Sequence, residues 1–129
     1  MPRRFVTIDG DDIGQRITSC YLTNDQLALT KTNELVSNTT KAIADFLGSN
    51  GFEVLFCAAD GVAASTESIV PDDKNLYDAI CMLAGHDLSF SVGVGTTLRE
   101  AYVALLSAKS SGKAQIKNYK EITGDVQNN

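Results

Sequence analysis

The segment Phe5-Val-Thr-Ile-Asp-Gly-Asp-Asp-Ile-Gly14 constrains the fold of this chain more than any other stretch. Its first residues favour a β-strand, and three carboxylates interrupted by one glycine follow directly. Ile13 and Gly14 then open a helix. A strand that ends in an aspartate before a tight turn presents that carboxylate at the end of a sheet. We therefore expect Asp9 at the tip of the first strand, accessible to a ligand.

A second carboxylate lies at a sharp reversal of the chain. The segment Val54-Leu-Phe-Cys-Ala-Ala-Asp-Gly-Val-Ala-Ala64 places Asp60 and Gly61 between two apolar runs. Asp-Gly is a common hairpin signal, so Asp60 is interpreted either as a turn residue alone or as a ligand-binding carboxylate. Its combination with Asp9 favours the second interpretation.

Apolar periodicity and capping signals predict the other elements. Thr23-Asn24-Asp25 starts a long helix that ends near Gly48. The remaining elements are a strand over 3–9, a short helix through 13–17 capped by Asp11 or Asp12, strands over 52–58 and 62–66, a helix over 71–85, a half-buried strand over 88–95, a helix after the capping box Thr97-x-x-Glu100 that ends at Gly112, and an edge strand over 115–119.

This order contains β-α-β-β-α-β, the ferredoxin-like split unit. The expected fold class is α/β (α+β), with a central antiparallel sheet and helices on one face. In this topology the end of the first strand and the hairpin turn lie together. Asp9 and Asp60 therefore come within reach of one ion, although they are far apart in sequence.

Length and composition indicate one domain. The 129 residues suffice for a single core without disulfide or metal staples. We expect residues 1–120 to form it and residues 121–129 to be a flexible polar tail. Cys20, Cys57 and Cys81 lack C-x-x-C spacing, which favours free thiols in a reducing cytoplasm. Cys57 lies in an apolar strand and is expected to be buried.

Charge and hydropathy exclude two classes of partner. The formal net charge of −5 argues against binding of long nucleic acid, which needs a basic face. Small nucleotides remain compatible, because a metal ion and one or two lysines can balance their charge. No apolar run approaches the roughly 18 residues of a membrane span, so we expect no membrane insertion.

The two aspartates suit a magnesium site. Mg²⁺ binds hard oxygen ligands at about 2.1 Å and usually takes one or two carboxylates, with phosphate and water completing the shell. In phosphoryl transfer such ions activate the attacking hydroxyl and hold the triphosphate. Asp9 and Asp60 are therefore the candidate catalytic and metal-binding residues. The alternative is that Asp60 only forms a turn and that Asp11 and Asp12 only cap a helix.

These residues also resemble a known group of proteins. Asp9-Gly-Asp-Asp-Ile-Gly14, Asp60 and Ser91-Val-Gly-Val-Gly95, followed by Ala108-Lys109 and Gly112-Lys113, resemble the palm domain of GGDEF and class III nucleotide cyclases. They are more similar still to the palm of type III CRISPR large subunits and to the minimal CRISPR polymerases, which consist of little more than that palm. The resemblance extends from Arg3 to Lys117.

The resemblance implies a role for each matching position. Asp9 and Asp60 correspond to the metal aspartates, the Gly10 carbonyl is a further metal ligand, and the implied cofactor is Mg²⁺ or Mn²⁺. Amides at the helix start face the triphosphate, because helix N-termini favour anions. The lysines neutralise phosphates or, alternatively, only favour the helix dipole. The nucleotide-binding residues expected in this way are Gly10, Asp11, Asp12, Ile13, Gly14, Ala58, Ala59, Lys109 and Lys113.

Two departures from the family pattern affect the chemistry. The family has Gly-Gly-Asp-Asp or Gly-Gly-Asp-Glu where this chain has Ala58-Ala-Asp-Gly61. Any role of the missing acid as base or second metal ligand therefore passes to Asp11, Asp12 or water. The asparagine that binds guanine in diguanylate cyclases corresponds to Ile17, which offers no hydrogen bond, so ATP is favoured over GTP.

The resemblance implies an enzyme that makes a cyclic di- or oligonucleotide from ATP with release of pyrophosphate. One small palm has one site, so a two-nucleotide product suggests a homodimer. The product is expected to act on a separate effector in antiviral defence. Three alternatives remain: a cyclase that makes cyclic AMP, an inactive palm that senses a nucleotide, and an interaction module without ligand.

Overall fold

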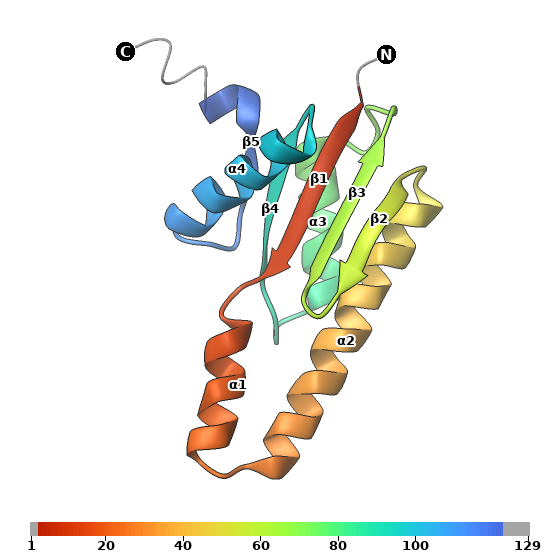
Figure 1. The fold of residues 1–129 in the computed structure, drawn as a ribbon. Coiled ribbons are helices and arrows are strands. Elements are labelled where there is room, and N and C mark those ends of the chain that lie inside the picture. The colour runs from red at the N-terminus through yellow and green to blue at the C-terminus, as the bar shows by residue number, and fades with distance from the viewer. Residues whose placement is uncertain (1–2, 123–129) are drawn as a thin grey trace.

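The structure is a computed structural model that describes residues 3–122. Within these residues the elements follow the order strand, helix, helix, strand, strand, helix, strand, helix, strand (Figure 1). Their bounds are β1 (Arg4–Gly10), α1 (Ile13–Leu22), α2 (Gln26–Ser49), β2 (Glu53–Ala58), β3 (Gly61–Thr66), α3 (Asp73–Ala84), β4 (Phe90–Gly95), α4 (Leu98–Ser110) and β5 (Ile116–Asn118). The expected tail over 121–129 lies outside the described residues from position 123 onward.

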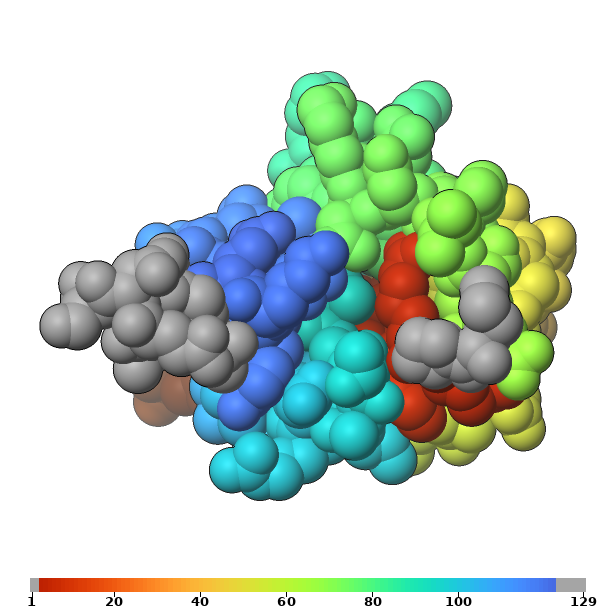
Figure 2. All heavy atoms as spheres, turned by 90° about the horizontal axis from the view of Figure 1, so that it is seen from above, coloured from red at the N-terminus to blue at the C-terminus, as the bar shows by residue number. Residues whose placement is uncertain are grey.

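The sheet has the strand order β2-β3-β1-β4-β5, which confirms the ferredoxin-like unit. β1 pairs antiparallel with both β3 and β4, and β5 adds a parallel edge strand. Figure 2 views the sheet from the end opposite the β2–β3 turn and shows red β1 between the hairpin strands and the blue C-terminal third of the chain. In the register, Asp9 lies opposite Gly61 on one side and Ser91 on the other.

The helices cover both faces of the sheet. α2 and α3, the two helices of the core unit, lie on one face as expected, whereas α4 crosses the other face (Figure 1). The glycines of β4 explain this position of α4. A Cβ atom at Gly93 would lie 2.1 Å from the carbonyl oxygen of Ala101, and one at Gly95 would lie 2.4 Å from Cβ of Glu100. These glycines allow the helix backbone to pack directly on the strand.

The core lies between the sheet and helices α2 and α3. All six residues of β4 are buried, so this strand is not half-buried as its alternation had predicted, because α4 covers its second face. The largest fully buried side chains come from these elements and from β1 and β3: Val6, Ile8, Ile43, Leu47, Val62, Leu76, Ile80, Phe90, Val92 and Val94.

Strand β2 differs most from its expected environment. Every residue from Glu53 to Ala58 is exposed, because β2 is an edge strand. The prediction of a buried Cys57 is therefore wrong: its thiol is free and exposed. The turn is also shifted, since Ala59 and Asp60 form it and Gly61 begins β3.

None of the helices within residues 3–122 is both long enough and apolar enough for a membrane span.

Candidate functional site

The connection from β1 to α1 is held in place by its own backbone. The amide of Gly10 donates to the carbonyl oxygen of Asp60 at 3.0 Å, and the amide of Asp11 donates to that of Ser89 at 2.9 Å. Gly10 is needed here because a Cβ would lie 2.8 Å from Cγ1 of Ile13 and 3.3 Å from Oδ2 of Asp60. The loop is thereby tied to the hairpin turn and to the start of β4.

Asp9 and Asp60 meet at this junction, as the topology predicted. Asp9 pairs with Gly61 across the sheet, and a Cβ placed at Gly61 would lie 3.7 Å from Oδ1 of Asp9. Burial raises the pKa of the Asp9 carboxyl, the Lys109 hydrogen bond lowers it, and the negative charge of Asp60 raises it further, with a net upward shift. Two carboxylates that repel each other at a strand end provide a place where a cation is stabilised.

The side chain of Lys109, in α4, extends to the junction at the end of β1. Its ammonium group lies 3.1 Å from Oδ2 of Asp9 and 2.8 Å from Oδ1 of Asp11. It also donates to the carbonyl oxygens of Gly10 at 2.9 Å and of Asp9 at 3.4 Å. Burial lowers the pKa of Lys109, but its hydrogen bonds to Asp11 and Asp9 outweigh burial and raise the pKa above its ordinary value. Lys109 is therefore a charged, anchored group at the junction.

Asp11 is the most enclosed carboxylate of the site, with 2% of its side chain exposed. Ser91 and Lys109 donate to its Oδ1 at 2.7 and 2.8 Å. Ser89 and the amide of Ala114 donate to its Oδ2 at 2.8 and 3.0 Å. Burial raises the pKa of Asp11, and hydrogen bonds from Lys109, Ser91 and Ser89 reverse this effect, so that its pKa lies below the ordinary value.

Asp12 and Lys113 form a second, more exposed contact with the loop. Asp12 is the residue before α1 and has a left-handed backbone with φ of 60°, but its side chain does not cap the helix. Instead its carboxylate pairs with the ammonium of Lys113, which follows the end of α4. The side chains of Lys113 and Asp12 are 38% and 50% exposed, so Lys113 is open to solvent and to a phosphate.

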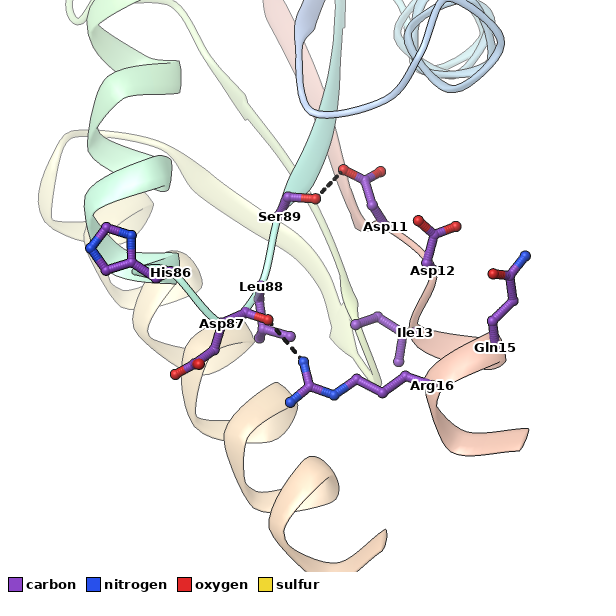
Figure 3. A pocket seen from close by; sticks show the side chains of 9 residues that line it. All are labelled: Asp11, Asp12, Ile13, Gln15, Arg16, His86, Asp87, Leu88 and Ser89. Atoms are coloured by element: carbon purple, nitrogen blue, oxygen red, sulfur yellow. Dashed lines mark hydrogen bonds between the residues drawn. The ribbon is translucent and has the colours of Figure 1, made fainter. Parts of the chain in front are cut away.

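A pocket of about 460 Å³ opens beside the loop. Figure 3 shows Asp11, Asp12 and Gln15 on one side and Asp87, Leu88 and Ser89 on the other. Arg16 spans the two sides, because its guanidinium donates to the carbonyl oxygen of Asp87 at 2.8 Å. The imidazole of His86 lies away from the carboxylates of Asp11 and Asp12 in this view.

A smaller pocket of about 280 Å³ lies on the α4 face of the sheet. Asp9 and Lys109 line it together with two aromatic side chains, Phe56 and Tyr102, each 57% exposed. Leu106 is exposed beside them. An apolar surface therefore adjoins the Asp9–Asp60 junction.

The oxygen groups present suit magnesium shared with a substrate. Within residues 3–122, no three histidine, cysteine or carboxylate side chains are grouped so as to hold a metal. The donors at the junction are instead two carboxylates, Asp9 and Asp60, and the carbonyl of Gly10. Hard oxygen donors in this number match an ion that takes the rest of its shell from phosphate and water.

The structure brings most of the sequence-predicted residues to this one end of the sheet. Ala58 and Ala59 are exposed at the hairpin, and the amides of Ile13 and Gly14 begin α1, where no preceding helical carbonyl is available to them. The amide and carboxylate of Asp11, by contrast, are already engaged. Asp11 therefore positions the loop and does not cap the helix.

Sequence reasoning missed four contributors to the site: Ser89, Ser91, Ala114 and Arg16. Ser91 in β4 and Ser89 just before that strand donate to the same carboxylate, and their i, i+2 spacing was the available signal. The Ala114 amide and the Arg16 contact depend on loop geometry, for which the sequence carries no comparable pattern.

The model of one protein family matches most of the chain, and solved structures share the fold. The matching family is described as mCpol, the minimal CRISPR polymerase domain, and the match covers residues 5–119. The GGDEF domain of DgcB from Caulobacter crescentus, solved with c-di-GMP, has a TM-score of 0.69 and 10% identity, over 92% of this chain and 78% of that chain. No protein of curated function matches the chain.

Two structures of a Csm1-Csm4 cassette are also similar. The one in complex with pppApA has a TM-score of 0.67 and 15% identity, over 88% of this chain and 20% of that chain. The one in complex with cA4 has a TM-score of 0.66 and 17% identity, with the same coverage. At such identities the likeness concerns the fold, and this chain corresponds to about a fifth of the longer one.

Proposed function

The chain belongs to the minimal CRISPR polymerase domain family, and we propose that it is a metal-dependent nucleotidyltransferase that joins ATP molecules into a cyclic di- or oligonucleotide. The observation that carries this proposal is the meeting of Asp9 and Asp60 beside two lysines of the α4 end. Acidic groups for a cation and basic groups for phosphates are the two requirements of phosphoryl transfer.

The reaction joins two nucleotides at one phosphorus atom. The 3′ or 2′ hydroxyl oxygen of one ATP attacks the α-phosphorus of another, and the bond from that phosphorus to pyrophosphate breaks. Asp9, Asp60 and the Gly10 carbonyl would hold Mg²⁺, which neutralises the triphosphate and favours ionisation of the attacking hydroxyl. Because Asp11 is saturated by donors and residue 61 is a glycine, the hydroxyl proton passes to Asp12 or to water.

The residues of the chain orient the triphosphate. The amides of Ile13 and Gly14 stand at a helix N-terminus, which favours an anion. Lys113 exchanges its exposed contact with Asp12 for a phosphate oxygen. The base of the nucleotide occupies the pocket beside Arg16 and Leu88.

Adenine is the proposed base. Ile17 has an aliphatic side chain that packs against the core, and such a side chain offers guanine no hydrogen bond. The Csm1-Csm4 structures of the same fold hold pppApA and cA4, which are adenylates.

We also propose a homodimer, because one palm supplies one nucleotide site and a two-nucleotide product needs two. The exposed apolar surface of β2 and α4, which includes Phe56, Tyr102 and Leu106, adjoins Asp9 and is suited to a second copy. The cyclic product is proposed to act on a separate effector in antiviral defence, in keeping with the family.

Product analysis by mass spectrometry tests the activity. The protein is incubated with each NTP and with mixtures, in Mg²⁺ and then in Mn²⁺, beside Asp9→Asn, Asp60→Asn and the control Asp45→Asn, which removes an exposed carboxylate of α2. A cyclic adenylate that disappears with the two site variants and persists with the control supports the proposal. The mass separates cyclic AMP from larger rings. Equal product from all variants contradicts it.

A second candidate is a palm that senses a nucleotide without turnover. Gly61 in place of an acid and the lack of a three-carboxylate group within residues 3–122 favour this candidate. It predicts that ATP with Mg²⁺ raises the melting temperature of the protein while no mixture of nucleotides gives a product.

A further inference from the structure

The ammonium group of Lys109 lies among the oxygens that a metal ion would use. It is 3.1 Å from Oδ2 of Asp9 and 2.9 Å from the carbonyl oxygen of Gly10. It also contacts Oδ1 of Asp11 at 2.8 Å and the carbonyl oxygen of Asp9 at 3.4 Å. Four oxygens from the end of β1 and the residue after it therefore surround one side-chain cation. Such charge-assisted contacts are strong because the group is partly desolvated, with 22% of the side chain exposed.

A divalent ion and the ammonium compete for this position. Mg²⁺ requires oxygen ligands at about 2.1 Å, and its double charge is repelled by an ammonium group bound to the same carboxylate. Asp9 is the shared ligand, whereas Asp11 is enclosed and stays with Lys109 in either state. A bare ion therefore has to displace Lys109 from Asp9 and Gly10 and supplies no new acceptor for the contacts that the lysine loses.

A triphosphate supplies the missing acceptor. Lys109 extends from α4, with its ammonium between the enclosed Asp11 and the exposed side of Asp9, whose side chain is 40% exposed. A phosphate oxygen beside Asp9 gives the ammonium a new partner without breaking its contact with Asp11. The carboxylate of Asp9 and the carbonyl of Gly10 are then released to the metal.

We propose that Lys109 occupies the cation position between Asp9 and Gly10 until a triphosphate draws it away, so that a divalent ion binds tightly only together with the nucleotide. This inference rests on the proposed metal site at Asp9 and Asp60. Lys109 acts here as a positioning residue that couples two ligands, and coupling of this kind is reciprocal.

Binding of Mn²⁺, followed by electron paramagnetic resonance, tests the competition between Lys109 and the metal ion without any turnover. Lys109→Met removes the competing cation, so Mn²⁺ alone should bind about tenfold more tightly than to wild type. The double variant Lys109→Met/Asp11→Asn restores the local net charge of wild type and should still bind Mn²⁺ more tightly, because the position is free. Unchanged or weaker binding by both folded variants overturns the proposal.

Two controls separate this inference from the proposed function. If Asp9→Asn and Asp60→Asn bind Mn²⁺ as wild type does, the metal site itself is refuted and the inference fails with it. If the two aspartate variants lose Mn²⁺ binding while the Lys109 variants bind Mn²⁺ no more tightly than wild type, the metal site stands and only the role of Lys109 is refuted.

The position of the Lys109 ammonium can also be followed in the wild-type protein, which does not depend on the folding of any Met variant. Proton–nitrogen NMR of ¹⁵N-lysine-labelled protein reports the ammonium group directly, with the Lys109 signal assigned by its loss in Lys109→Arg. Mg²⁺ alone should leave the signal in place, and Mg²⁺ with inorganic tripolyphosphate should shift it. A shift at the same Mg²⁺ concentration with and without tripolyphosphate overturns the proposal.

Discussion

The substitution Asp11→Asn should destabilise the fold substantially, because no orientation of an amide satisfies its surroundings. Each carboxylate oxygen accepts one serine hydroxyl and one group that can only donate: Lys109 at Oδ1 and the Ala114 amide at Oδ2. Serine hydroxyls can turn and accept from the new NH₂ group. The ammonium of Lys109 and the amide of Ala114 cannot accept a hydrogen bond, so one of them must face the NH₂ group of the asparagine.

The expected cost is about 2–4 kcal/mol, since a lost hydrogen bond to a charged group costs about 1.5–3 kcal/mol and an unpaired buried donor adds to it. For a domain of this size, this corresponds to a fall in melting temperature of roughly 8–16 °C. Urea titrations followed by circular dichroism measure the free energy of unfolding. Asp45→Asn, on the exposed side of α2, is the matched control and should change it by less than about 0.5 kcal/mol.

The same titration at several pH values tests the electrostatic part of the argument. The pKa of Asp11 lies below its ordinary value in the folded protein, because hydrogen bonds from Lys109, Ser91 and Ser89 outweigh burial. Ionised Asp11 therefore stabilises the fold above its ordinary pKa, and this contribution is lost as pH falls through the lower folded value. The difference between wild type and Asp11→Asn should be largest at neutral pH and shrink below about pH 4. A variant as stable as wild type at pH 7, or a difference independent of pH, refutes the reasoning.

Three further substitutions test other parts of the structure. Gly93→Ala places a Cβ 2.1 Å from the carbonyl oxygen of Ala101 and should cost about 3 kcal/mol or more in urea titrations; wild-type stability would contradict the packing of α4 on β4. Lys113→Gln removes a solvent-exposed ion pair with Asp12 and should change the free energy of unfolding by less than about 1 kcal/mol. It should weaken ATP binding in calorimetry, so an unchanged affinity argues against a phosphate contact. Phe56→Glu puts a charge on the exposed apolar surface and should shift the protein towards monomer in light scattering; a dimer of undiminished affinity would place the interface elsewhere.

The meeting of Asp9 and Asp60 followed from sequence because it depends on topology alone. Strand order fixes which strand ends are neighbours, and a β-hairpin keeps its turn beside the strand to which it pairs. No side-chain packing had to be foreseen. The fold class and the position of the two aspartates were therefore accessible from patterns of residues.

Features that depend on tertiary surroundings were not accessible in this way. Asp11 and Asp12 are neighbours in sequence, yet one is enclosed by four donors and the other is half exposed, because only Asp11 accepts from Ser89 and Ser91. The apolar sequence of β2 predicted a buried strand, but an edge position exposes Cys57. The two glycines of β4 did carry the signal for α4, since small side chains along one strand face allow a helix to pack closely.

The partners of Asp11 lie between 78 and 103 residues further along the chain. Such long-range contacts form late, because the intervening chain must first be ordered to bring the ends together. The loop that follows Asp9 and Gly10 therefore reaches its final shape only when β4, α4 and the segment at Ala114 are all in place. If the proposed function holds, nucleotide binding requires the completed fold, and a partly folded molecule with an intact hairpin does not bind.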